Sequence, residues 1–134
     1  MDKTFVGIDF GTCNLKVMYK KNNKFYELKL HKEVNSLDGQ TPNVILYAKN
    51  SKGNIEHIIG KSALKNEDYP NTIKYIKKKL QQQNWKGFIP NLGRDVEAAE
   101  VSKDIFKFIS KQLDERIKNE KEIAITMPVC FSEL

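Results

Sequence analysis

The stretch from Val6 to Asn14 constrains this chain more than any other part of its sequence. It begins inside a short apolar run at residues 4–8, which has the composition of a buried strand. A carboxylate and a glycine end that run, and a second apolar run at residues 15–19 follows too soon for a helix to fit between them. The stretch therefore predicts two strands joined by a tight turn.

The turn has the composition of a phosphate-binding loop. Gly11 lets the backbone approach an anion closely, and the successive amide groups of Gly11, Thr12 and Cys13 can form a small concave nest of donors. Asp9, beside that nest, can hold a hydrated divalent cation that accompanies a phosphate. A hairpin turn in which the glycine serves geometry alone is the alternative interpretation.

The turn resembles the first phosphate loop of the superfamily that contains actin, the sugar kinases and the heat-shock chaperones. Residues 7–12 read G-I-D-F-G-T and are most similar to the seventy-kilodalton chaperones of the DnaK type, whose loop reads G-I-D-L-G-T-T-N. Cys13 replaces the second threonine of that pattern. A thiol is a weaker donor and acceptor than a hydroxyl, so the side-chain contact is weakened while the backbone contact remains.

Four further segments resemble the same family, in the same order along the chain. They are T-P-N-V at residues 41–44, I-G-K-S-A at 59–63, N-T-I-K-Y-I-K-K at 71–78 and I-A-I-T-M-P-V-C-F at 123–131. The corresponding family patterns are T-P-S-V, V-G-x-x-A, N-T-V-x-x-x-K-R and A-V-I-T-V-P-A-Y-F. Several matches in one order are more specific than any one alone, so the sequence predicts membership of this family.

The resemblance implies an α/β fold, the first lobe of a ribonuclease-H-like, actin-like ATPase domain. Residues 1–38 and 98–134 would form its lower part, a five-stranded mixed sheet with helices, and residues 39–97 a small upper α+β subdomain. In the family a second lobe, with another phosphate loop and the adenosine pocket, and then a peptide-binding domain follow. We therefore expect these 134 residues to be an ATPase fragment that is inactive alone. A non-catalytic binding or structural fragment is the alternative.

The resemblance also implies which residues would hold ATP or ADP and Mg²⁺. Gly11, Thr12, Cys13 and Asn14 would contact the nucleotide phosphates. Asp9 would bind the magnesium ion through water. In the full-length protein the implied partners are unfolded peptides, a J-domain co-chaperone and a nucleotide exchange factor.

Lys77 is the implied catalytic residue, because the family's lysine at this position of N-T-x-x-x-x-K reaches the γ-phosphate and the attacking water. A helix predicted at residues 71–80 would have Ile73, Ile76 and Leu80 on its apolar face. That spacing places Lys77 on the inward side. A lysine that snorkels from the edge of the face is the alternative.

Hydrophobic periodicity and turn residues predict the remaining elements. Strands are expected at residues 4–9, 15–20, 25–30, 43–48, 54–59 and 122–127, with a hairpin at 85–89 and 93–97. Helices are expected at residues 61–66, at 71–80 with Asn71 as N-cap, and at 98–118. We expect the first three strands to be antiparallel neighbours and the last strand to lie parallel beside the first.

Composition limits the partners and the cellular location that we expect for the protein. The formal charge of +6 comes from lysines scattered along the chain, with arginine almost absent, which is typical of a solvated surface rather than a nucleic-acid-binding patch. No segment approaches the roughly 20 apolar residues of a membrane span, and no signal peptide precedes the first strand. Cys13 and Cys130 lack metal-ligand spacing, which favours a reducing cytoplasm.

The final predicted strand and the residues after it carry apolar side chains that would need to be covered. In the family, a further helix covers the sheet near the final strand. Without that helix, apolar surface near Ile125, Met127 and Phe131 would be exposed. Large exposed apolar patches tend to be covered by another molecule, so the sequence predicts self-association through this strand.

Overall fold

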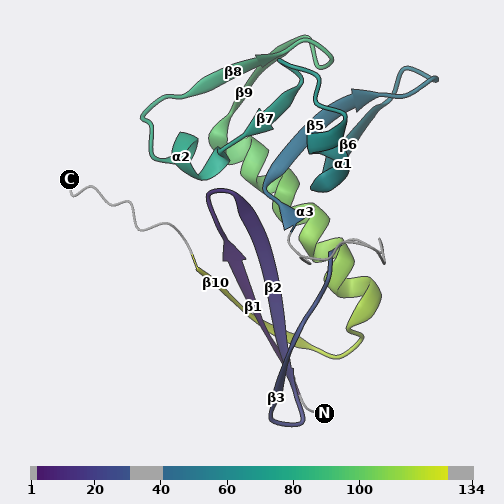
Figure 1. Ribbon diagram of the computed structural model, residues 1–134, viewed down its shortest axis with the longest axis vertical. Coiled ribbons are helices and arrows are strands. Elements are labelled where there is room, and N and C mark those ends of the chain that lie inside the picture. Colours follow the sequence, from purple (N-terminus) through teal and green to yellow (C-terminus); the bar gives the residue numbers. More distant parts are fainter. Residues whose placement is uncertain (1–2, 31–40, 127–134) are drawn as a thin grey trace.

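A computed structural model describes residues 3–30 and 41–126 of the chain (Figure 1). Three sheets are arranged around one long helix, α3 (Ala98–Arg116), which passes from the upper sheets toward the lower one. The protein is therefore of mixed α/β class. The expected residues Met127, Cys130 and Phe131 lie outside the described part of the chain.

The lower sheet is mixed and has five strands. They are β1 (Thr4–Phe10), β2 (Asn14–Lys21), β3 (Lys24–Glu27), β4 (Thr41–Pro42) and β10 (Lys121–Thr126). The order is β10-β1-β2-β3, with β4 also pairing β2. β1, β2 and β3 pair in antiparallel fashion, whereas β10 runs parallel to β1. The five-stranded mixed sheet and these neighbours confirm the prediction, although β3 ends before residue 30.

Buried and exposed side chains alternate strictly along β1, which shows which face of this sheet is in the core. Thr4, Val6, Ile8 and Phe10 are buried, whereas the residues between them are exposed. Successive side chains of a strand point to opposite faces, so one face of β1 packs into the core and the other faces solvent. The Phe10 ring stacks on Phe106 of α3, with the ring centroids 5.0 Å apart. The buried face is therefore the face toward α3.

The upper part contains a three-stranded sheet and a hairpin. β5 (Val44–Lys49) lies between β6 (Ile55–Ile59) and β7 (Thr72–Lys74), both antiparallel to it. The short helix α1 (Lys61–Lys65) follows β6, and the predicted hairpin is present as β8 (Lys86–Ile89) and β9 (Arg94–Glu97). The predictions for these segments are confirmed to within a few residues.

The helix predicted at residues 71–80 is wrong in its first half. Residues Thr72–Lys74 form β7, Tyr75 has the left-handed φ of 58°, and only then does α2 (Ile76–Leu80) begin. The side chains of Thr72 and Ile73 are buried. These β-branched residues fit a strand paired with β5 better than a helix, and an apolar pair alone does not separate the two periods.

Asn71 is consequently not an N-cap. Its side-chain amide donates to Asp68 Oδ2 at 3.0 Å, and its Oδ1 accepts from the Asn91 backbone N–H at 2.8 Å. Its carbonyl accepts from the Tyr47 N–H at 3.0 Å. Asn71 therefore joins the start of β7 to β5 and to the β8–β9 turn.

The long helix, predicted at residues 98–118, is present as α3 and buries one apolar stripe. Its buried stripe residues are Ala98, Val101, Ile105, Ile109 and Leu113, and Ile117 directly after the helix is also buried. Phe108 is only half-buried. Residues of this stripe share one hydrophobic cluster with the lower sheet, with the upper sheet and with the hairpin. No helix within the described residues is long and apolar enough to cross a membrane.

The edge strand β10 leaves apolar side chains accessible. Ile123 is 46% exposed and Ile125 is 42% exposed. In the parallel register they lie opposite Val6 and Ile8, whose side chains are buried. Ile123 and Ile125 therefore extend the apolar face of β1 to the edge of the sheet, where it is accessible to solvent. Self-association through this edge stays a prediction.

Replacing Ile109 with alanine should strongly destabilise the protein. This side chain is fully buried, and removing it leaves a cavity in the cluster that joins all three sheets. We expect a loss of about 2–5 kcal/mol in the free energy of unfolding, measured by urea denaturation. Lys107→Ala, at an exposed position of the same helix, should change it by about 0.5 kcal/mol or less. Equal effects would contradict the assigned core.

Stability at alkaline pH should depend on Tyr47. Burial and the hydrogen bond that its hydroxyl donates to Asp104 raise the pKa of Tyr47. Because the fold favours the protonated phenol, this contribution is present below the unfolded-state pKa of about 10 and is lost as the pH rises toward the folded-state pKa. Tyr47→Phe should therefore lose less unfolding free energy than the wild type between about pH 9 and 11. If urea titrations showed the same loss of unfolding free energy in both proteins over this pH range, this prediction would be contradicted.

Candidate functional site

The turn between β1 and β2 needs a glycine for its geometry. The Gly11 N–H donates to the Asn14 carbonyl oxygen at 2.9 Å. A Cβ atom on Gly11 would lie only 2.6 Å from that same oxygen. Any side chain at position 11 would therefore force the turn open. This close contact satisfies the turn interpretation, and it means that the Gly11 N–H is used within the turn and is not offered to an anion.

Asn43 holds the turn against the segment between β4 and β5. Its backbone N–H donates to the Cys13 carbonyl at 2.8 Å, and its Nδ2 donates to the Gly11 carbonyl at 2.8 Å. The side chain is 1% exposed. Two hydrogen bonds from one buried residue thus fix the two carbonyl groups that flank Thr12. The sequence analysis used position 43 only as part of a motif and missed this contact.

The turn opens onto a cavity of about 240 Å³. The residues that line it come from the turn, from the segment at β4 and β5, from α1 and from the end of β7: Thr12, Cys13, Asn14, Pro42, Asn43, Val44, Leu64, Lys74 and Tyr75. Three of the four predicted phosphate-binding residues therefore share one hollow. Lys74 and Tyr75 also line this cavity, and the sequence did not predict them as site residues.

Asn43 also carries an unsatisfied acceptor. Within the described residues, Asn43 Oδ1 is buried and accepts no hydrogen bond. Buried polar atoms are nearly always hydrogen-bonded to protein or to water. Because this oxygen is buried, it offers no contact to an occupant of the cavity, although Asn43 is one of the lining residues.

Asp9 stands on the open face at the end of β1. Its side chain is exposed, and its Oδ1 lies 3.1 Å from Thr126 Oγ1 of β10. Across residues 3–30 and 41–126, no group of three or more His, Cys, Asp or Glu side chains comes together. Protein ligands in this part therefore form no cage for a metal. Asp9 fits only the predicted kind of site, in which water and phosphate oxygens complete the magnesium shell.

Lys77 is half-buried as the second residue of α2. The predicted inward face of its helix included Ile73. Ile73 belongs to β7 and not to this helix, so that part of the prediction is wrong. Lys77 is not among the residues that line the cavity beside the turn, whereas Lys74 is. Its catalytic role rests on the sequence motif alone.

Comparison with known proteins adds no family to these observations. No protein-family model matches the chain, and no curated protein matches its sequence. The function is therefore argued from the motifs and from the geometry of the turn and its cavity.

Gly11→Ala should destabilise the protein, because the added Cβ would meet the Asn14 carbonyl oxygen at 2.6 Å. We expect a loss of about 1–3 kcal/mol in unfolding free energy, measured by urea denaturation. Gly7→Ala is the matched control, since a Cβ on Gly7, in the adjoining strand β1, meets nothing within 4 Å. That change should be neutral or stabilising by about 0.5–1 kcal/mol. Similar values for both variants would contradict the tight turn.

Proposed function

We propose that this chain forms the first-lobe part of the ATPase domain of a DnaK-type chaperone, which would hydrolyse ATP to ADP and phosphate with magnesium. The observation that carries the proposal is the motif-bearing turn, which opens through Thr12, Cys13 and Asn14 onto a cavity. The order of the five sequence motifs and the mixed sheet around β1 and β10 support it.

The turn would act on the phosphate groups mainly through its backbone. Asn43 fixes the carbonyls of Gly11 and Cys13, so those oxygens are already hydrogen-bonded and the turn is held in one conformation. The Gly11 N–H already donates to the Asn14 carbonyl, so the amides of Thr12 and Cys13 are the ones that would bind an anion. Amide groups held in advance toward an anion bind it without a cost of ordering the loop. The exposed thiol of Cys13 would contribute little, since it is a weak donor.

Asp9 and Lys77 would carry the charges that phosphoryl transfer needs. Magnesium bound near Asp9 would neutralise the phosphate oxygens, as metal ions do in phosphoryl transfer. Lys77 follows Tyr75, a cavity-lining residue, by two positions, and its long side chain is half-buried. In the proposal its ammonium reaches the γ-phosphate and the attacking water. The contribution is one of position and electrostatics, because this chemistry needs little covalent participation.

The 134-residue chain alone should bind magnesium-ATP weakly and should not hydrolyse it, because a second lobe would supply the other contacts and exclude water. We expect a dissociation constant of about 1 mM or weaker. In a two-dimensional NMR titration, the amide signals of Gly11, Thr12, Cys13 and Asn43 should move first. Micromolar affinity, or shifts confined to residues remote from the turn, would contradict the proposal.

The assigned lysine can be tested in the full reading frame that would contain the second lobe. Lys77→Ala should leave nucleotide affinity within a few-fold of the wild type and slow single-turnover hydrolysis by about 100-fold or more. Lys78→Ala, at the exposed neighbouring position of the same helix, is the control and should hydrolyse at near the normal rate. An unchanged single-turnover rate in Lys77→Ala would reject the catalytic role.

A further inference from the structure

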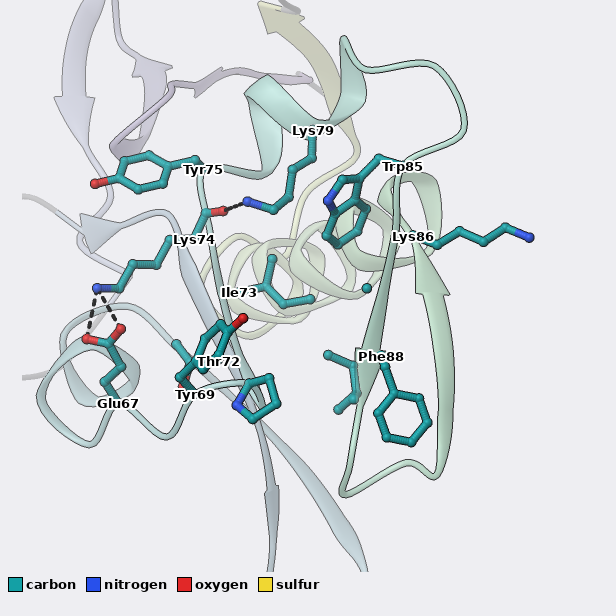
Figure 2. A pocket seen from close by; sticks show the side chains of 13 residues that line it. Glu67, Tyr69, Thr72, Ile73, Lys74, Tyr75, Lys79, Trp85, Lys86 and Phe88 are labelled. Carbon is teal, nitrogen blue, oxygen red and sulfur yellow. Dashed lines mark hydrogen bonds and ion pairs between the residues drawn. The ribbon is translucent and has the colours of Figure 1, made fainter.

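A second cavity, of about 540 Å³, lies between β7 and β8 (Figure 2). Its walls combine apolar, aromatic and cationic residues: Glu67, Tyr69, Pro70, Thr72, Ile73, Lys74, Tyr75, Lys79, Trp85, Lys86, Gly87, Phe88 and Ile89. Figure 2 shows β7 on one side of the hollow and β8 on the other, with Ile73 and Trp85 directed into it. The size is within the range of ligand sites, about 300–1,000 Å³.

Within the described residues, both strands that flank this cavity have one edge without a partner strand. β7 is the outer strand of its sheet, and β8 pairs with β9 on one side. The Asn71 carbonyl accepts from the Tyr47 N–H, so Asn71 and Ile73 direct their backbone groups toward β5. Backbone direction alternates along a strand, so those of Thr72 and Lys74 point away from β5, where the Thr72 N–H already donates to the Asp68 carbonyl at 3.1 Å. Accordingly, the Lys74 carbonyl accepts from Lys79 Nζ at 2.8 Å across the hollow.

Apolar side chains form the floor and rim between these two edges. Ile73 and Ile89 are buried and Trp85 is half-buried, whereas at the rim Tyr69 is 84% exposed and Phe88 is 55% exposed. Unpaired strand edges beside exposed apolar side chains are normally covered or broken up in proteins. In this protein they face each other across a hollow, which is a geometry suited to an inserted strand.

The charges around the cavity are unequal. Its lining has three lysines and one glutamate, an excess of two positive charges. The glutamate is already used, since Glu67 pairs with Lys74 at 2.8 Å. Lys79 lies over the Trp85 ring, 5.5 Å from its centroid, and burial lowers the pKa of its ammonium. A carboxylate brought to this wall would stabilise the charged form of Lys79 and complement the positive excess.

We propose that this groove binds an extended acidic peptide segment, which adds a strand between β7 and β8, places an apolar side chain against Trp85 and Ile73, and sets a carboxylate near Lys79. Main-chain hydrogen bonds to a free edge supply affinity in such strand addition, and pockets for alternate side chains supply selectivity. This proposal does not depend on the proposed ATPase chemistry, although the two cavities share Lys74 and Tyr75 in their linings.

The contacts favour a peptide over a single-stranded nucleic acid. Base stacking needs an open aromatic face beside free cations. Here the Lys79 ammonium lies over the Trp85 ring, and Lys74 is already paired with Glu67. On β7 the Thr72 N–H and the Lys74 carbonyl are already hydrogen-bonded, which leaves the Thr72 carbonyl and the Lys74 N–H for an added strand. These groups match the amide and carbonyl groups of an extended peptide and have no use for a base.

Trp85 is the single tryptophan of the chain, so its fluorescence reports on the groove directly. The probes are three acetylated, amidated peptides, Glu-Val-X-Val-Glu, with X as Leu, Val or Phe, titrated into the 134-residue protein. At least one should give a saturable change in Trp85 emission and shift the NMR amide signals of Lys74 and of β8. The absence of both changes with all three peptides up to about 1 mM would overturn the proposal.

Two altered peptides test the mode of binding. The same peptide N-methylated at alternate residues keeps its side chains but loses donors for the strand edges, and should bind about tenfold more weakly. Lys-Val-X-Val-Lys should also bind more weakly, because its charge matches that of the groove. Equal affinity of the N-methylated peptide would overturn strand addition. Saturable binding of oligothymidylate without binding of any peptide would show a nucleic-acid site and overturn the proposal as well.

A pair of lysine variants tests the assigned cation. Lys79→Gln keeps a donor for the Lys74 carbonyl but removes the charge, and should weaken binding of the Glu-containing peptide about five-fold or more. Lys52→Gln, in the exposed turn between β5 and β6, is the matched control and should bind normally. Circular dichroism and urea denaturation establish that each variant is folded. Unchanged affinity in folded Lys79→Gln would overturn the role of this residue.

Discussion

The apolar face of α3 is the contact on which the rest of the structure depends. A single hydrophobic cluster includes Val101, Ile105 and Ile109 of this helix together with buried residues of the lower sheet, the upper sheet and the hairpin. The short β-sheets of the upper part could not each bury a core alone, because two- and three-stranded sheets need another layer to pack on. The helix supplies that layer to all of them. Tyr47 then ties β5 to α3 through its hydrogen bond to Asp104.

Those features of the fold that follow from local pattern could be predicted from the sequence. The stripe of α3 repeats every three to four residues over 19 residues, and β1 alternates strictly, so each has a clear period. Residues 71–80 show no clear period of this kind. Pairing with β5 makes Thr72–Lys74 a strand, and the left-handed Tyr75 separates that strand from α2. Neither the partner strand nor the backbone reversal can be read from ten residues taken alone.

The same distinction applies to the candidate site. Gly11 was predictable, because a glycine beside small polar residues after an apolar run indicates a tight turn. Asn43 was not, since it meets Gly11 across 32 positions of sequence and only the folded chain brings the two together. Lys74 and Tyr75 reach the cavity because β7 ends beside the turn, and that placement depends on the strand that the sequence did not predict.

Lys74 and Tyr75 line both cavities, the one beside the Gly11 turn and the one between β7 and β8. The two hollows therefore share a wall, formed where β7 ends and the chain reverses at Tyr75. Lys74 is held there by its ion pair with Glu67 and by the hydrogen bond that its carbonyl accepts from Lys79. Any occupant of one hollow that displaces this residue changes the shape and charge of the other. Because such coupling is reciprocal in free energy, a ligand in one cavity that changes the affinity of the other cavity for its ligand by some factor has its own affinity changed by the same factor when that second ligand binds.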